Sequence, residues 1–133
     1  MESNALIQSI EEFDETTVDS HDTRIRKFWS PNPQITNYLV ESCTANHYTT
    51  ILDVGAGPSP FPRATHLIDA VAGPSVYQVD IDYEPIPFPI RHFQFVYCRH
   101  TIEDIQNPLH AVQEIFRVSQ NGYIETPSPL LNL

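Results

Sequence analysis

The residue types best suited to chemistry in this sequence stand at or just after short apolar segments. The first segment, Ile51-Leu52-Asp53-Val54, leads into Gly55-Ala56-Gly57, where two glycines allow the backbone to pass close to a ligand. Other charged side chains follow later segments: Asp69, Asp82, Arg99, His100 and Glu103. The sequence therefore predicts a ligand site in which a glycine loop meets carboxylates and an imidazole.

The elements that must position these residues alternate between strand-like and helical or irregular segments. The predicted strands are residues 49–54, 65–69, 75–79, 93–98 and 123–126, with Asn121-Gly122 predicted as a turn. Short strands in this alternation predict an α/β fold with an open, mostly parallel twisted sheet. Ligands of such sheets bind at the carboxyl ends of the strands, where the charged residues lie.

Two helices flank the predicted strands. Ser30-Pro31 is a typical helix start, with a capping hydroxyl before proline, and Asn107-Pro108 is a second one. The apolar residues predicted to point inward from the second helix are Leu109, Val112, Ile115, Phe116 and Val118.

The chain is predicted to consist of an N-terminal arm, residues 1–30, and one core domain, residues 31–133. The arm is acidic, and its apolar residues recur at roughly helical spacing. Both a short amphipathic helix and a mobile tail fit this pattern.

Composition narrows the range of partners. The net charge is −10, from seven basic and 17 acidic residues, which disfavours a nucleic-acid substrate. No apolar run has the length of a membrane span, and the first residues do not resemble a signal peptide. Cys43 and Cys98 are predicted to be buried thiols in a reducing compartment, with a single disulfide as the alternative. These features predict a cytoplasmic protein.

Two other kinds of site fit the sequence poorly. A dinucleotide site requires a third glycine that opens a helix, but the residues after Gly57 are Pro58-Ser59-Pro60. A metal site is not indicated, because the six histidines and two cysteines lack ligand-type spacing.

The ordered set of motifs resembles the class I S-adenosylmethionine-dependent methyltransferases over residues 50–127. Residues 53–57 are similar to the family's first motif, Asp69 to its ribose-binding acid, and 82–88 to its segment from an adenine-contacting aspartate to Pro-Phe. Residues 93–103 resemble the strand-four signature, and 107–127 resemble the helix and strand that follow. The resemblance implies a Rossmann-like fold with S-adenosylmethionine as cofactor.

The resemblance also assigns roles to individual residues. It implies that Asp53, Gly55, Ala56, Gly57, Asp69, Asp82 and Arg99 form the cofactor site. Position in the chain, not the resemblance, suggests the base: for an acceptor that bears a proton, His100 is the first candidate and Glu103 the second, because both follow predicted strand four. The alternative for His100 is to shape the cofactor pocket without proton transfer. The expected substrate is a small molecule or another substrate of modest size, since the charge of the chain disfavours large nucleic acids.

The sequence ends just after predicted strand five, whereas the family's sheet normally continues with two more strands. An uncovered strand edge favours association. Either a homodimer through this edge or a fragment of a longer protein is expected. The absent strands also leave open a catalytically reduced, methyltransferase-like binding module as the alternative to an enzyme.

Overall fold

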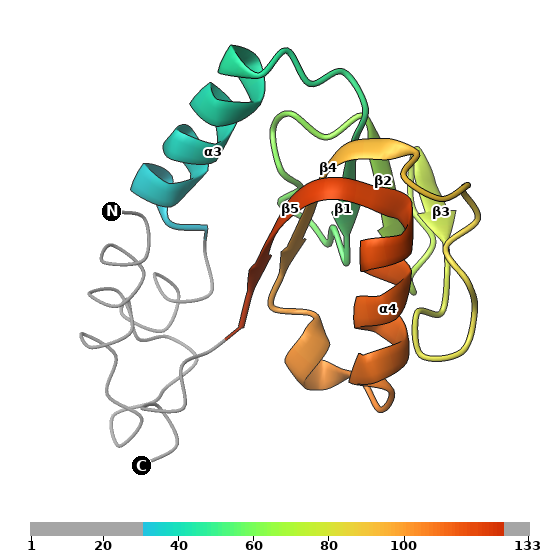
Figure 1. The fold of residues 1–133 in the computed structure, drawn as a ribbon. Helices are drawn as coiled ribbons and strands as arrows, with labels where there is room; N and C mark the ends of the chain where they lie inside the picture. Colours follow the sequence, from blue (N-terminus) through green and yellow to red (C-terminus); the bar gives the residue numbers. More distant parts are fainter. Residues whose placement is uncertain (1–30, 127–133) are drawn as a thin grey trace, which may run out of the picture. The chain divides into compact units, whose positions relative to one another are not determined.

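The fold is an α/β arrangement around one parallel sheet, seen in a computed structural model that describes residues 31–126 (Figure 1). The five strands have the order β3-β2-β1-β4-β5, and each neighbouring pair is parallel. The elements are α3 (Pro33–Ala45), β1 (Ile51–Val54), β2 (His66–Asp69), β3 (Val76–Gln78), β4 (Phe93–Arg99), the 3₁₀ helix η2 (Ile102–Asp104), α4 (Pro108–Val118) and β5 (Ser119–Glu125). The predicted open parallel sheet is confirmed.

The strand order reverses between β1 and β4. From β1 the chain adds β2 and β3 on one side, and it then crosses to the other side to form β4 and β5. Open α/β sheets bind ligands outside the carboxyl ends of the strands at such a reversal. The segments that follow Val54 and Arg99 therefore flank the expected site.

One face of the sheet packs against α4 and forms the hydrophobic core. Leu52 pairs with Val96 and Val54 with Cys98, so alternate residues of β1 and β4 point to this face. The buried residues that meet there are Leu52, Val54, Ile68, Val79, Ile81, Ile86, Phe93, Val96, Cys98, Ala111, Ile115 and Val118. This core fixes α4 relative to the strands that carry the predicted site.

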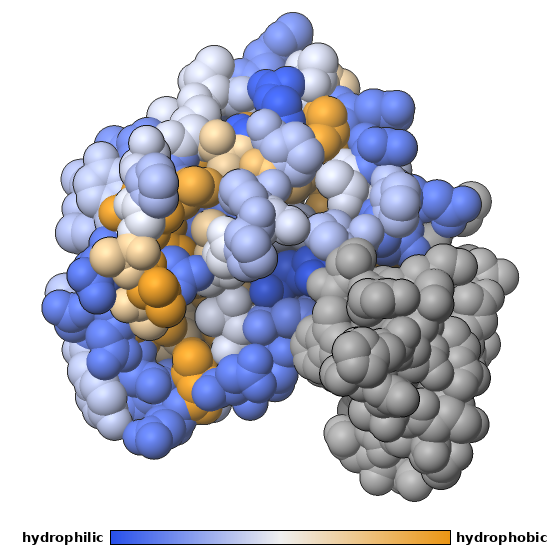
Figure 2. All heavy atoms as spheres, turned by 180° about the vertical axis from the view of Figure 1, so that it is seen from behind, coloured by the Kyte–Doolittle hydropathy of each residue, from blue (hydrophilic) through white to orange (hydrophobic). Residues whose placement is uncertain are grey.

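The predicted inward face of α4 is partly wrong. Ala111, Ile115 and Val118 are its buried residues, at spacings of four and three that define one side of a helix. Leu109 and Phe116 are instead 69% and 67% exposed. Figure 2 shows hydrophobic patches among hydrophilic surface residues, so apolar character alone does not identify the core face.

The prediction of a turn at Asn121-Gly122 is also wrong. Both residues lie inside β5, which follows α4 without a connecting loop. Gly122 pairs with Val96, and a Cβ added to Gly122 would lie 2.9 Å from the Val96 carbonyl oxygen. The glycine therefore permits the close approach of two strands.

Helix α3 begins two residues later than predicted. The side-chain oxygen of Asn32 accepts hydrogen bonds from the N–H groups of Gln34 and Ile35, at 2.9 and 3.2 Å. Asn32 is thus the capping residue and Pro33 takes the first helical position. The start predicted at Ser30-Pro31 is wrong, because the better cap and a second proline follow directly.

Both cysteines are buried free thiols, in agreement with the first of the two expectations. Burial raises the pKa of the Cys98 thiol to about 12, and burial also raises the pKa of Cys43. Both thiols are therefore neutral at physiological pH. The predicted reducing, cytoplasmic compartment stays a prediction.

Residues 43–126 form one compact unit that contains the whole sheet and α4, while 31–42 belong to a second unit. The predicted arm, residues 1–30, lies outside the described residues, and the predicted boundary at residue 30 stays a prediction. None of the helices between residues 31 and 126 has the length and apolar character needed to cross a membrane.

Strand β5 ends the sheet on one side among the described strands. A hollow of about 490 Å³ lies beside it and is lined in part by Ile115, Phe116 and Ile124. The homodimer expected through this edge stays a prediction.

Candidate functional site

The glycine loop after β1 folds back against the end of β2. The N–H groups of Gly55 and Ala56 both donate to the carbonyl oxygen of Ile68, at 2.9 and 3.2 Å. Gly55 and Gly57 have φ angles of 72° and 57°, in the left-handed region that glycine adopts at little cost. The loop therefore turns tightly at the carboxyl edge of the sheet.

The segment after β4 packs directly on this loop through Thr101. The Thr101 hydroxyl donates to the carbonyl oxygen of Val54 at 3.3 Å. A Cβ added to Gly55 would overlap the same hydroxyl. The two segments that flank the strand-order reversal are therefore in contact, which places His100 beside the glycine loop.

Asp53 is buried in the sheet and faces a loop of the protein itself. Its side chain accepts a hydrogen bond from the Phe61 N–H at 2.7 Å, and the residue is 2% exposed. Burial raises the pKa of Asp53 to about 6; the Phe61 hydrogen bond opposes this rise, and the nearby Asp69 adds to it. The observed contact fixes the loop at Phe61, while the predicted contact with a cofactor stays a prediction.

Asp69, the last residue of β2, is joined to the glycine loop. One carboxylate oxygen accepts from the Gly57 N–H at 2.8 Å, and the other accepts from the Val71 N–H at 3.1 Å. An ionised carboxylate has about four acceptor positions, so these two contacts leave each oxygen able to accept another donor. The structure therefore brings Asp69 and Gly57 together at one edge.

Asp82 lies in the loop between β3 and β4 and contacts the start of α4. Its side chain accepts from the Asn107 N–H at 2.9 Å, and its carbonyl oxygen accepts from the Asn107 side-chain amide at 3.1 Å. Asp82 is thus fixed from the helix side.

A polar cluster joins the carboxyl ends of β4 and β5 around Glu125. One Glu125 oxygen lies 2.8 Å from His100 Nε2 and 3.1 Å from Arg99 Nε, and the other accepts from the Tyr123 hydroxyl at 2.8 Å. The backbone N–H of His100 also donates to the Glu125 carbonyl oxygen at 2.8 Å. The imidazole is therefore held from both its ring and its backbone.

The electrostatics of the cluster favour an ionised Glu125. Burial by itself would raise the pKa of Glu125, but hydrogen bonds from His100 and Tyr123, with the charge of Arg99, outweigh burial and lower it. An ionised carboxylate only accepts hydrogen bonds, so His100 Nε2 carries the proton in this contact.

Glu103 lies on the other side of the His100 ring, in η2. Its side chain is 22% exposed and lies 4.0 Å from His100 Nδ1. Burial raises the pKa of Glu103, an effect opposed by its own backbone hydrogen bond and by His100. Within residues 31–126, no three metal-ligating side chains gather into a cluster.

The predicted residues therefore fall into three groups by their contacts. Asp53, Gly55, Ala56, Gly57 and Asp69 form the loop at the ends of β1 and β2; Arg99, His100 and Glu103 lie at the end of β4; Asp82 is held by α4. Thr101 joins the first two groups. The sequence analysis did not predict Thr101 and Glu125 as residues of the candidate site, although an acid at the end of an otherwise uncharged strand was a usable signal for Glu125.

Comparisons with known proteins assign the chain to a family. The family described as "Methyltransferase domain" matches residues 13–132, and the chain belongs to this family. S-adenosylmethionine is the cofactor of the family, as predicted from the sequence. A solved S-adenosylmethionine-dependent methyltransferase from Aquifex aeolicus is similar at 16% identity, with a TM-score of 0.44, over 68% of this chain and 69% of that chain. A search of curated proteins with the sequence gave no match.

Proposed function

We propose that the chain transfers a methyl group from S-adenosylmethionine to a small-molecule acceptor, with His100 as the general base. The contact between His100 and Glu125 carries this proposal, because it orients an imidazole at the strand-order reversal beside the glycine loop. When bound, the cofactor supplies an electrophilic methyl group on a sulfonium. The acceptor lone pair forms the new bond to carbon as the carbon–sulfur bond breaks.

The residues around the loop fit such a cofactor. Gly57 has no side chain, and the nearest atom to a Cβ added there lies 3.9 Å away, so the backbone of the loop is open to a ligand at this point. The Asp69 carboxylate, at the end of β2, can still accept hydrogen bonds. A carboxylate at this place in an open α/β sheet is suited to bind the two hydroxyls of a ribose. Asp53, Ala56, Asp82 and Arg99 complete the proposed cofactor site.

Proton removal is assigned to His100. A proton leaves the acceptor oxygen or nitrogen as the new bond forms, and Nδ1 is the ring nitrogen that takes it up. Glu125 holds the opposite nitrogen at 2.8 Å and stabilises the imidazolium that results. Glu103, 4.0 Å from Nδ1, is the second candidate for the base and adds negative charge near this nitrogen.

The proposed acceptor is a small molecule. Methyl transfer requires chiefly that the nucleophile and the methyl carbon be aligned with water excluded, which a small pocket can provide. The net charge of −10 disfavours a polyanionic substrate.

A second candidate function is binding of the cofactor without turnover. The His100 side chain is 8% exposed, so an acceptor must approach a nearly buried ring for proton transfer. A methyltransferase-like module that binds the cofactor and acts through a partner or a homodimer fits this burial.

Turnover separates the two candidates. Labelled S-adenosylmethionine is incubated with pooled small hydroxyl and amine compounds, and release of S-adenosylhomocysteine is measured. Wild type should release it in an acceptor-dependent way, and His100→Asn should be slower by about 100-fold. The matched control, His92→Asn at an exposed histidine, should behave like wild type. Equal rates for His100→Asn would exclude the base role, and cofactor binding without release would favour the binding module.

A further inference from the structure

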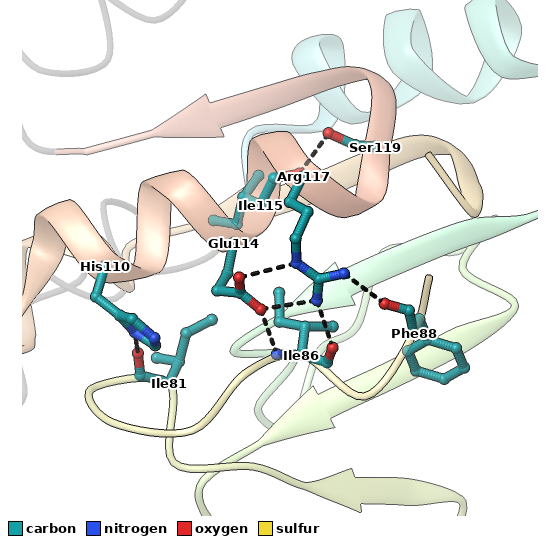
Figure 3. Close-up of polar contacts among 8 residues, drawn as sticks. All are labelled: Ile81, Ile86, Phe88, His110, Glu114, Ile115, Arg117 and Ser119. Carbon is teal, nitrogen blue, oxygen red and sulfur yellow. Dashed lines mark hydrogen bonds and ion pairs between the residues drawn. The ribbon is translucent and has the colours of Figure 1, made fainter. Parts of the chain in front are cut away.

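Helix α4 carries a row of polar side chains that run along the loop between β3 and β4. The row consists of Asn107, at the helix cap, then His110, Glu114 and Arg117, at successive spacings of three, four and three. Such spacings place residues on one side of a helix. Figure 3 shows His110, Glu114 and Arg117 pointing from α4 toward the loop residues Ile81, Ile86 and Phe88.

The C-terminal half of the row binds the loop backbone through three hydrogen bonds. The Ile86 N–H donates to Glu114, and the Ile86 carbonyl oxygen accepts from Arg117, both at 2.8 Å. Arg117 also donates to the Phe88 carbonyl oxygen at 2.8 Å (Figure 3). Both polar backbone groups of Ile86 are thus satisfied by side chains of one helix.

Glu114 and Arg117 are themselves joined in a bidentate pair. Arg117 Nε and Nη2 donate to the two Glu114 oxygens at 2.9 and 2.8 Å. The Arg117 hydrogen bond lowers the pKa of Glu114, burial opposes it, and the Ile86 N–H lowers it further. An exposed ion pair on a helix contributes little to stability. This pair also makes charge-assisted hydrogen bonds to the backbone of the loop. The pair therefore holds the loop as well as the helix.

The N-terminal half of the row binds an earlier part of the same loop. His110 Nδ1 lies 3.0 Å from the Ile81 carbonyl oxygen, and Asn107 binds both the side chain and the carbonyl oxygen of Asp82. Between these points, the buried side chains of Ile81 and Ile86 enter the core. The loop that carries Asp82 is therefore bound to α4 and its cap at two places, residues 81–82 and residues 86–88.

We propose that Glu114 and Arg117 are positioning residues, which fix the loop so that Asp82 is presented to the cofactor. This inference rests on the proposed function, because Asp82 is assigned to the cofactor site there. Neither residue contacts Asp82 directly; they act through the backbone of Ile86 and Phe88. We call the Glu114–Arg117 pair and its hydrogen bonds to the loop backbone the clamp. Loss of the clamp should reduce cofactor affinity only while Asp82 is present.

Calorimetric titration with S-adenosylhomocysteine tests the clamp. Glu114→Gln should weaken binding by about tenfold, since it removes the charge from the pair that holds Ile86. In the Asp82→Ala background, the same substitution should cause little further loss, and this coupling is not expected of a purely structural residue. Gln113→Ala, at an exposed position of the same helix, is the matched control and should bind like wild type.

Two further variants keep the test decisive if Glu114→Gln unfolds. Arg117→Lys retains the charge but loses the planar fork, and it should weaken binding in the same Asp82-dependent way. The exchange Glu114→Arg with Arg117→Glu retains an ion pair but places a donor opposite the Ile86 N–H, so it should not restore affinity. Absence of binding by wild type would overturn the proposed function and the clamp together. Wild-type binding that these variants leave unchanged, or losses that add to that of Asp82→Ala, would overturn the clamp alone.

Discussion

Gly55 lies so close to Thr101 that a Cβ added to Gly55 would overlap the Thr101 hydroxyl. Gly57, two residues later, shares the positive φ angle but has no atom nearer than 3.9 Å to its own added Cβ. An alanine at Gly57 would therefore introduce backbone strain alone, whereas an alanine at Gly55 would introduce the same strain and a steric overlap.

Gly57→Ala should lower the free energy of unfolding by about 1–2 kcal/mol, the cost of a left-handed alanine. Gly55→Ala should cost at least about 3 kcal/mol, because overlap with Thr101 adds to the same strain. Urea unfolding of the two variants measures the difference. Equal losses would show that the contact between the glycine loop and the segment after β4 is looser than described.

Glu125→Gln should destabilise the protein by about 2–3 kcal/mol at pH 7, because the buried side chain loses its charge beside Arg99 and His100. The folded-state pKa of Glu125 is lowered, so its stabilising contribution is present above the usual value of 4.5 and is lost as the pH falls. The difference between wild type and variant should therefore shrink below about pH 4.5. Glu41→Gln, at an exposed glutamate, is the control and should leave the free energy of unfolding unchanged both at pH 7 and below about pH 4.5.

Asp53→Asn should show the opposite pH dependence. The pKa of Asp53 is raised from 3.8 to about 6, so the folded protein holds this proton more tightly than the unfolded chain does. The contribution of Asp53 to stability should fall between about pH 4 and 6 and stay low above this range. The variant lacks this loss and should be more stable than wild type by about 2–3 kcal/mol at pH 7.5, but not at pH 4. Urea unfolding at the two pH values checks this, and a constant difference would contradict the raised pKa.

The parallel sheet and the place of the glycine loop could be predicted because both depend on local patterns. Short apolar runs indicate buried strands, and Gly55 and Gly57 come directly after the run that forms β1. The inward face of α4 could not be predicted as well, since Leu109 and Phe116 are apolar yet exposed. Small Ala111 takes a core position that composition alone does not reveal.

The polar cluster at Glu125 could not be predicted from local sequence patterns, because it depends on how two strands pair. Arg99 and Glu125 meet because β4 and β5 pair in one register, and Gly122 permits that pairing by its close approach to Val96. With Gly122 predicted as a turn residue, the fifth strand was predicted to begin at residue 123 instead of Ser119. The pairing of Arg99 with Glu125 was therefore not predicted. Tertiary pairing thus decided the role of a residue that local rules assigned to a loop.

Asp69 offers the most direct test of the proposed cofactor site, because it joins the end of β2 to the glycine loop through Gly57. The measurement is calorimetric titration of the full chain with S-adenosylmethionine and S-adenosylhomocysteine, with NAD as the control ligand. Saturable binding of both sulfur compounds, none of NAD, and loss of binding in folded Asp69→Ala are the predicted results. A folded wild-type protein that binds neither sulfur compound, or an Asp69→Ala variant that binds both as tightly as wild type, would contradict the proposed site.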